Sequence, residues 1–503
     1  MPCKFHRERP WPFENLGPGC QFEGETDFFG FADKSWCRFH LPMEDDEGNR
    51  SEKADWGENE VTRFNASVLA FIDEARGDKK TADLTGVAFP VNVSFAGFTK
   101  DKPFPRVCFI KAAFSGGANF GEAAFSGAAD FSEAAFSRGA NFGEAAFSGA
   151  ADFSEAAFSG NANFGKAAFS RAANFVKGAF SGNAYFREAA FSGNAYFCEA
   201  AFSRGANFGE AAFSRAANFD EAAFSGNAYF SKAAFSRAAN FGEATFSGNA
   251  NFREAAFSSD AYFSGAADFS GGADEEAPSR KFRIADFADV VFKGRADFFN
   301  RRFLDTARFT KTIFHVAPEF HNAELRQDTD FTGATFEDTS KEHAARAYRT
   351  LKLAMGNIGA RNEEAMFYAL EQKSLRDSMD KSLRNLMSNK GFVWLLTLLY
   401  ERTADYGRSV VLPLGWLVGV TVVFWFCYAL AAAAPGAAFD FAMAQLFRPF
   451  SVWIPLKAAG APEAAVFATP PLLLKFLATL QSVISLGLLT LFILAVRRRF
   501  RLN

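Results

Sequence analysis

The sequence predicts a mainly β repeat solenoid that is followed by a helical membrane region. Phe residues recur at alternating intervals of five and six from Phe109 to Phe269, a spacing that fits no regular helix. Beyond residue 341 the apolar residues recur at three- and four-residue steps, and two long uncharged stretches lie near the C-terminal end. The 503-residue chain contains 66 Phe but only nine Tyr and seven Trp, so Phe fills one kind of structural position many times.

The repeat unit has eleven residues and two Phe, and Ala almost always stands two positions before each Phe, as with Ala123 and Phe125. An eleven-residue helical repeat would place apolar residues at three- and four-residue steps, and Gly in nearly every unit would weaken a helix. Short extended segments fit better, with Phe and Ala pointing inward and corners at Ser-Gly or Gly-Asn. We expect Gly and Asn at these corners because tight turns demand positive φ.

The central Phe with Ala two residues earlier, together with TADLT at 81–85, resembles the pentapeptide-repeat family. The resemblance implies a right-handed, four-sided β-helix over residues 82–337. The chain departs from the family pattern because every second unit has a sixth residue, as in Ser-Gly-Asn-Ala-Tyr-Phe at 181–186. By analogy with the family, one coil holds about 22 residues, and Phe rings stack between coils at ~4.8 Å.

A coil of this length would stack charged residues along one edge of the solenoid. The residues in that column are Glu122, Glu144, Lys166, Glu188, Glu210, Lys232 and Glu254. We expect the two Lys to relieve repulsion between carboxylates on adjacent coils. The array breaks at 271–281, which we expect to be a surface loop, and it resumes from Phe282 to Phe336 as the terminal coils and their cap.

Residues 1–45 form a Cys/His-rich segment, and residues 46–81 are expected to be a linker or an N-terminal cap. The opening stretch MPCKFHRERPWPFENLG lacks the apolar core of a secretory signal, so we expect reduced thiols, which favours metal binding over disulfides. A Cys-x2-His pair can supply two zinc ligands from one tight turn. We predict a structural zinc ion held by Cys3, Cys20, Cys37 and His40, with His6 as the alternative to Cys3. Unliganded, reduced thiols are the competing interpretation.

The last third of the chain is expected to be helical and to enter a membrane. Residues 338–390 have the pattern of two amphipathic helices, with ten Lys/Arg against six Asp/Glu between 341 and 390. The segments expected next are an interfacial helix at 391–400, a transmembrane helix at 410–434, an extracytoplasmic loop at 435–471, a second transmembrane helix at 472–496 and a basic cytoplasmic tail at 497–503. Because RRRFR follows the second span, the positive-inside bias places both termini in the cytoplasm, at a bacterial inner (cytoplasmic) membrane.

A net charge of −3 gives no reason to expect nucleic-acid binding, and the sequence contains no phosphate-binding Gly loop, nucleophile elbow or paired-acid motif. We therefore expect a protein that is not an enzyme. The leading hypothesis is a membrane-anchored interaction scaffold, which contacts membrane lipid and presents a rigid β-helical rod to an unidentified protein partner on the cytoplasmic face. The sequence leaves homo-oligomer formation open.

Two other functions compete with the scaffold. A small two-span channel or membrane sensor, gated by the repeat domain, would use the segment between the spans as a pore helix, although that segment has no Gly-rich filter. Some members of the family that the repeat resembles mimic DNA and occupy topoisomerases. Residues 109–270 hold 15 acidic and 11 basic residues, a weak charge beside that of a DNA duplex, which argues against such a mimic here.

Overall fold

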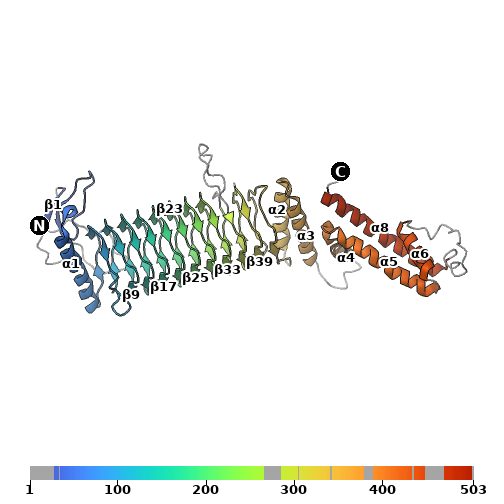
Figure 1. The fold of residues 1–503 in the computed structure, drawn as a ribbon, viewed down its shortest axis with the longest axis horizontal. Helices are drawn as coiled ribbons and strands as arrows, with labels where there is room; N and C mark the ends of the chain where they lie inside the picture. The colour runs from blue at the N-terminus through green and yellow to red at the C-terminus, as the bar shows by residue number, and fades with distance from the viewer. Residues whose placement is uncertain are drawn as a thin grey trace. The chain divides into compact units, whose positions relative to one another are not determined.

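The structure is a computed structural model that describes residues 28–32, 34–265, 285–303, 305–339, 342–378, 389–432, 435–447 and 470–500. The described residues fall into two compact units. The first contains the residues up to Asp338 together with Asn357–Gly359, and the second contains the other residues from Thr339 onward. The first unit is the solenoid with its N-terminal elements, and the second is helical (Figure 1).

The solenoid has four faces, each a parallel sheet of two-residue strands (Figure 1). In the order of the chain around one coil, face 1 runs from β3 (Ala82–Asp83) to β37 (Ala296–Asp297), and face 2 from β4 (Ala88–Phe89) to β31 (Thr245–Phe246). Face 3 runs from β5 (Val93–Ser94) to β38 (Ala307–Arg308), and face 4 from β9 (Ala124–Phe125) to β40 (Thr335–Phe336). The expected four-sided β-helix is confirmed, and it is followed by helices.

The register confirms a coil of 22 residues in the uniform array. Ala129 pairs with Ala151, and Ala151 pairs with Ala173. Each residue therefore lies above the residue that is two eleven-residue units earlier in the chain. Backbone hydrogen bonds join the coils, as where the N–H of Phe131 donates to the carbonyl of Asp152 at 2.6 Å. Five-residue units therefore form faces 1 and 3, and six-residue units form faces 2 and 4.

The core consists of four columns of stacked Phe rings with small Ala side chains beside them. Phe197 lies 4.8 Å from Phe175 below and 4.8 Å from Phe219 above, with ring planes within 2° of parallel. It meets Phe186 of the neighbouring face edge-on, at 5.3 Å and 87°. These are the two arrangements that aromatic pairs prefer, so one residue type satisfies both contacts. The expected stacking distance is confirmed.

The expectation that Gly and Asn supply the positive φ at the corners is wrong for the uniform array. Left-handed backbone occurs there at charged residues, such as Glu144 (φ 60°) and Lys166 (φ 57°), once in every five-residue unit. Gly149, in a six-residue unit, is needed for a different reason: a Cβ there would lie 2.4 Å from the backbone of Gly127 in the coil below. Arg171 occupies the equivalent corner one coil further along, so Gly is required only where two backbones approach this closely.

Lys side chains interrupt the columns of carboxylates, as expected from the sequence. Lys166 lies 3.9 Å from Glu144, and Lys232 lies 3.8 Å from Glu254. All four side chains are about half exposed, so each pair contributes little to stability and chiefly removes repulsion.

A helix covers the N-terminal end of the solenoid (Figure 1). The elements before the first coil are β1 (Phe28–Phe31), β2 (Lys34–Cys37), η1 (Glu52–Asp55) and α1 (Glu58–Gly77). Helix α1 buries Phe64, Val68 and Ile72, and the ring of Phe64 meets Phe89 of the first coils at 5.8 Å. This helix keeps the first Phe rings out of water, which an open end of the stack would expose.

Arg301 is fully buried at an inward position that carries Ala in the uniform array. Its guanidinium donates to the carbonyls of Ala244 at 3.1 Å and Phe241 at 3.2 Å. In the coil below, the carbonyl of Ala222 accepts the backbone N–H of Thr245 instead. Arg301 thus supplies a side-chain donor on face 2, in the part of the solenoid next to the expected loop at 271–281, which lies outside the described residues.

The second unit begins with α2 (Glu342–Asn357) and α3 (Arg361–Asp377), which are joined by ion pairs. Glu371 is buried and accepts from both Arg349 and Lys352 at 2.7 Å. From α3, Arg376 pairs with Glu401 of α4 (Asn389–Ala404) and donates to the Tyr406 hydroxyl in η3 (Asp405–Gly407). These contacts connect the amphipathic pair to the apolar helices.

Two helices of this unit, α5 (Val411–Ala432) and α8 (Leu472–Phe500), contain segments long and apolar enough to cross a membrane. Helix α6 (Pro435–Phe447) lies beside both (Figure 1). Buried polar side chains link the three: the Tyr428 hydroxyl donates to Gln481 at 2.9 Å, Gln481 donates to the Ala442 carbonyl at 3.0 Å, and Ser482 donates to Gln445 at 3.2 Å.

Replacing Phe197 with Ala should destabilise the solenoid by about 3–5 kcal/mol, because the change removes two stacked ring contacts from one column and leaves a cavity among backbones that cannot collapse. The measurement is urea unfolding of the full chain in detergent, followed by β-sheet circular dichroism. Glu199→Ala, at an exposed corner two residues away, is the control and should change little. Equal effects of the two substitutions would contradict the assigned core.

Candidate functional site

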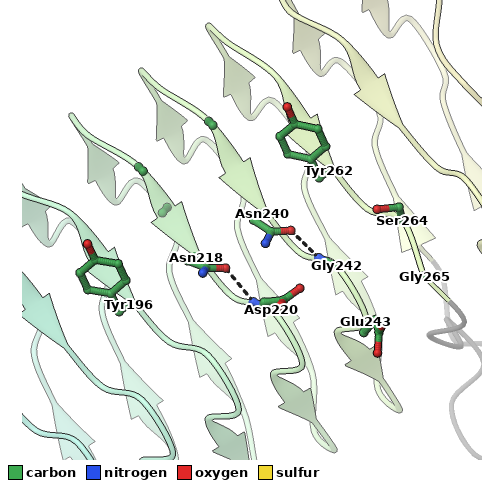
Figure 2. A pocket seen from close by; sticks show the side chains of 12 residues that line it. Tyr196, Asn218, Asp220, Asn240, Gly242, Glu243, Tyr262, Ser264 and Gly265 are labelled. Carbon is green, nitrogen blue, oxygen red and sulfur yellow. Dashed lines mark hydrogen bonds between the residues drawn. The ribbon is translucent and has the colours of Figure 1, made fainter.

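A shallow groove of about 490 Å³ crosses four coils of face 1 (Figure 2). Its residues come from equivalent outward positions on β22 (Ala195–Tyr196), β26 (Ala217–Asn218), β30 (Ala239–Asn240) and β34 (Ala261–Tyr262). The register pairs Tyr196 with Asn218, Asn218 with Asn240, and Asn240 with Tyr262. Two Tyr rings therefore bound a floor of two amides.

The two amides of the floor present hydrogen-bond donors to the groove. The side-chain carbonyl of Asn218 accepts the backbone N–H of Asp220 at 3.1 Å, and that of Asn240 accepts the N–H of Gly242 at 2.9 Å (Figure 2). These bonds fix the amide orientation and leave both NH₂ groups without a partner among the described residues. These half-buried donors can bond a ligand's carbonyl or hydroxyl oxygens.

The amides on the N-terminal coils of face 3 differ, because they bond to one another. Asn163 donates to Asn141 at 2.9 Å, and Asn141 donates to Asn119 at 2.9 Å. The same residue type at the equivalent position thus forms a chain of amide hydrogen bonds from Asn119 to Asn163 on face 3 and an open floor at Asn218 and Asn240 on face 1. Tyr185 and Tyr229 on face 3 are each 38% exposed, which makes that face a matched surface for comparison.

Charges differ between the two edges of the groove. The corner after the strands carries exposed Glu199, Glu221 and Glu243, with Asp220 beside them, whereas the corner before the strands carries exposed Arg215 and Arg237. The Tyr hydroxyls are held in place: Tyr196 accepts from Asn194 at 2.9 Å and Tyr262 donates to Asp260 at 3.2 Å. The groove therefore offers hydrogen-bond donors on its floor and charges of opposite sign along its two edges.

Near its N-terminal end, face 1 carries buried carboxyl groups instead of amides. Asp130 is only 4% exposed, with Asp152 on the next coil and Asp83 two strands below. Burial is the main cause that raises the pKa of Asp130 to about 6; the charges of Asp152 and Asp83 act in the same direction, and two hydrogen bonds from Ser132 act against it. At neutral pH this column holds negative charge that the fold does not favour.

The structure brings two of the predicted zinc ligands together. Cys37 and His40 are both buried, with the Cys37 sulfur 3.0 Å from His40 Nδ1. Cys3, His6 and Cys20 lie outside the described residues, and no group of three or more His, Cys, Asp or Glu side chains gathers like a metal site in the part of the chain that the structure describes. Lys53 is buried nearby, and burial lowers the pKa of its ammonium well below the usual range.

Comparison with known proteins agrees with this geometry. Residues 109–157, 131–179 and 219–267 match the family model described as pentapeptide repeats (9 copies). The solenoid is a pentapeptide-repeat domain. No curated protein and no solved structure matches the chain.

Sequence reasoning did not identify the groove of this pentapeptide-repeat domain. The available signal was that Tyr replaces Asn at two outward positions, Tyr196 and Tyr262, which are 66 residues apart. A coil of 22 residues places these two Tyr three coils apart on one face. Lys53 and Arg301 gave no such signal, because each resembles a surface residue in the sequence and is buried only by the packing around it.

Asp130→Asn should stabilise the protein at neutral pH. The pKa of Asp130 is higher in the folded state than in the unfolded chain, so the folded state binds more protons and stability falls as pH rises from about 4 to 6. The gain should reach about 3 kcal/mol above pH 7 and vanish near pH 4. Asn already occupies this position in other coils, as at Asn174, where its side chain accepts the equivalent backbone N–H.

The measurement is the unfolding midpoint of the full chain in detergent between pH 4 and 8. Glu199→Gln, which neutralises an exposed carboxylate, is the control and should follow the wild-type profile. An Asn variant with an unchanged pH profile would show that the Asp130 carboxyl is not desolvated as the structure indicates.

Proposed function

We propose that this protein is a non-enzymatic, membrane-anchored scaffold whose pentapeptide-repeat rod binds a protein partner along face 1. The observation that carries the proposal is the groove between Tyr196 and Tyr262, with its unpaired amide donors. Aromatic side chains that offer both an apolar ring and a polar end are enriched at protein interfaces. The partner segment that fits best is an extended peptide, whose carbonyls accept from Asn218 and Asn240 and whose basic side chains face the acidic edge.

The apolar helices support the anchoring. Side chains on α5 such as Val423 (61% exposed), Phe426 (61%) and Leu430 (71%), and Phe476 (65%) on α8, would contact water if the unit were not in lipid. On α4, Phe392, Leu396 and Leu399 are exposed on one side of the helix, which fits a position at the membrane surface. Basic residues flank both spans, and the positive-inside bias then places the rod and both termini in the cytoplasm of a bacterial cell.

The polar groups buried within the helical unit support an anchor more than a channel. Tyr428, Gln481, Gln445 and Ser482 bond to one another or to backbone, as polar side chains do when they fix helix packing in membranes. Ion conductance of the purified chain in a planar bilayer would contradict this and favour the two-span channel.

Site-specific crosslinking tests the partner groove. A photoreactive amino acid in place of Asn218, on face 1, should capture one protein reproducibly in native membranes, whereas the same residue in place of Asn207, on face 3, should not. Tyr196→Ala with Tyr262→Ala should reduce the captured product at least tenfold. Tyr185→Ala with Tyr229→Ala is the matched control on face 3, and an equal loss with this pair would contradict a specific groove on face 1.

Thiol labelling of intact spheroplasts tests the orientation. In a chain without its native Cys, a Cys introduced at Ala461, in the expected extracytoplasmic loop, should react with an impermeant maleimide. A Cys in place of the exposed Glu199 should react only after the membrane is opened. Labelling of the solenoid from outside would reject the cytoplasmic scaffold in favour of a role in the cell envelope.

A further inference from the structure

Face 2 of the solenoid presents a smooth surface of small side chains. The outward residue of every strand from β7 (Ala113–Phe114) to β27 (Ala223–Phe224) is Ala. The register places these residues directly above one another, as where Ala157 pairs with both Ala135 and Ala179. Ala135, Ala179 and Ala201 are exposed, so no described part of the chain covers them. A second sheet can therefore approach this face more closely than the ~10 Å that is usual between stacked sheets.

The two edges of face 2 differ in charge. The corner before the strands is mostly acidic, and its exposed residues are Lys111, Glu133, Glu155, Lys177, Glu199, Glu221 and Glu243. At the corner after the strands, two exposed Arg, Arg138 and Arg204, alternate with Gly. Neither Arg forms an ion pair with a residue that the structure describes. One edge thus carries an excess of carboxylates, and the other carries guanidinium groups whose charge is not compensated by a neighbour.

These edges become complementary when face 2 of one copy meets face 2 of a second copy. A two-fold axis parallel to the solenoid sets the corner before the strands of one copy opposite the corner after the strands of the other. Each Arg follows the Glu of its own coil by five residues, which is ~1 Å along a solenoid that rises ~4.8 Å per coil. Arg138 therefore faces Glu133 of the second copy, and Arg204 faces Glu199. Both Lys of the acidic corner face Gly.

Face 4 has the same Ala surface without this complementarity. Its outward residues are also Ala, from β9 to β33 (Ala256–Phe257). The same two-fold arrangement would set two of its three Arg opposite Lys, because Lys166 would face Arg171 and Lys232 would face Arg237. Like charges directly opposite one another are destabilising. Charge therefore distinguishes two faces whose surfaces are otherwise alike.

Charge also selects the relative orientation of the two copies. If the two solenoids ran in opposite directions, a two-fold axis along the strands would set one acidic corner against the other. In the parallel arrangement each acidic corner faces the corner that carries Arg. Two copies anchored in one membrane by the same helices are also parallel, so this step rests on the anchoring proposed above.

We propose that face 2 is a self-association surface, through which two membrane-anchored copies pair side by side in parallel. The Ala surface is ~30 Å long, so the contact is smaller than the ~800 Å² per partner of a standard interface. Anchoring compensates for the small area, because it raises the effective concentration of the second copy and fixes its orientation. The pair leaves face 1 of both copies open and so presents two grooves on opposite sides.

Disulfide formation in native membranes tests the pairing. In a chain without its native Cys, the thiol of Ala179→Cys should lie opposite the same thiol of the second copy, because the two-fold axis runs along the Ala surface. We expect mild oxidation to convert most of this variant to a covalent dimer, but less than a tenth of Ala168→Cys, the exposed equivalent on face 4. Ala135→Cys and Ala201→Cys, three coils apart, should each link to themselves, which antiparallel pairing does not allow for both.

Charge reversal separates a specific interface from random collision. In the Ala179→Cys chain, Arg138→Glu with Arg204→Glu should lower the dimer yield at least fivefold, and adding Glu133→Arg with Glu199→Arg should restore it. Equal yields on faces 2 and 4, or a yield that does not respond to charge reversal, would overturn the pairing.

The same variants distinguish failure of the pairing from failure of the proposed function. Loss of the dimer with unchanged capture through Asn218 would reject the pairing alone and leave the scaffold. A chain recovered outside the membrane fraction would reject the anchoring, and the parallel pairing with it.

Discussion

The structure depends on one constraint: each side chain in the uniform array lies directly above and below residues 22 positions away. Register of this kind turns every position of the repeat into a column of neighbours at ~4.8 Å. Columns of Phe are favourable because the rings stack face to face, as Phe197 does with Phe175 and Phe219. Columns of carboxylates are unfavourable, and Lys166 and Lys232 interrupt them.

The same constraint decides where a binding site can form. Since Phe and Ala fill the interior, the solenoid has room for chemistry only at outward positions, and faces 1 and 3 carry the polar residues there. An unbroken column of Asn closes on itself through amide hydrogen bonds, as at Asn119, Asn141 and Asn163. A groove arises on face 1 where Tyr196 and Tyr262 replace Asn and bound a floor whose donors remain open (Figure 2).

Much of the fold could be predicted because the spacing of residues within the repeat determines the geometry of the coil. The Phe and Ala spacing determines which residues point inward, and the length of two units determines the coil. The site was harder to predict, since a groove is a relation between coils: Tyr196 and Tyr262 become neighbours of one surface only once the register is known. The left-handed corners were assigned to the wrong residues, because Glu144 and Lys166 adopt φ values that their own preferences disfavour and that coil-on-coil hydrogen bonds impose.

Where the register of the coils ends or changes, the chain buries a long basic side chain, Lys or Arg. Lys53 at the N-terminal end and Arg301 on face 2 each donate to two backbone carbonyls. A carbonyl at such a place cannot rely on the next coil for its donor, and a flexible side chain reaches it from a distance. The two solutions differ in geometry. The two parallel donors of Arg301 suit carbonyls three residues apart, whereas the single nitrogen of Lys53 reaches the carbonyls of two consecutive residues, Arg38 and Phe39.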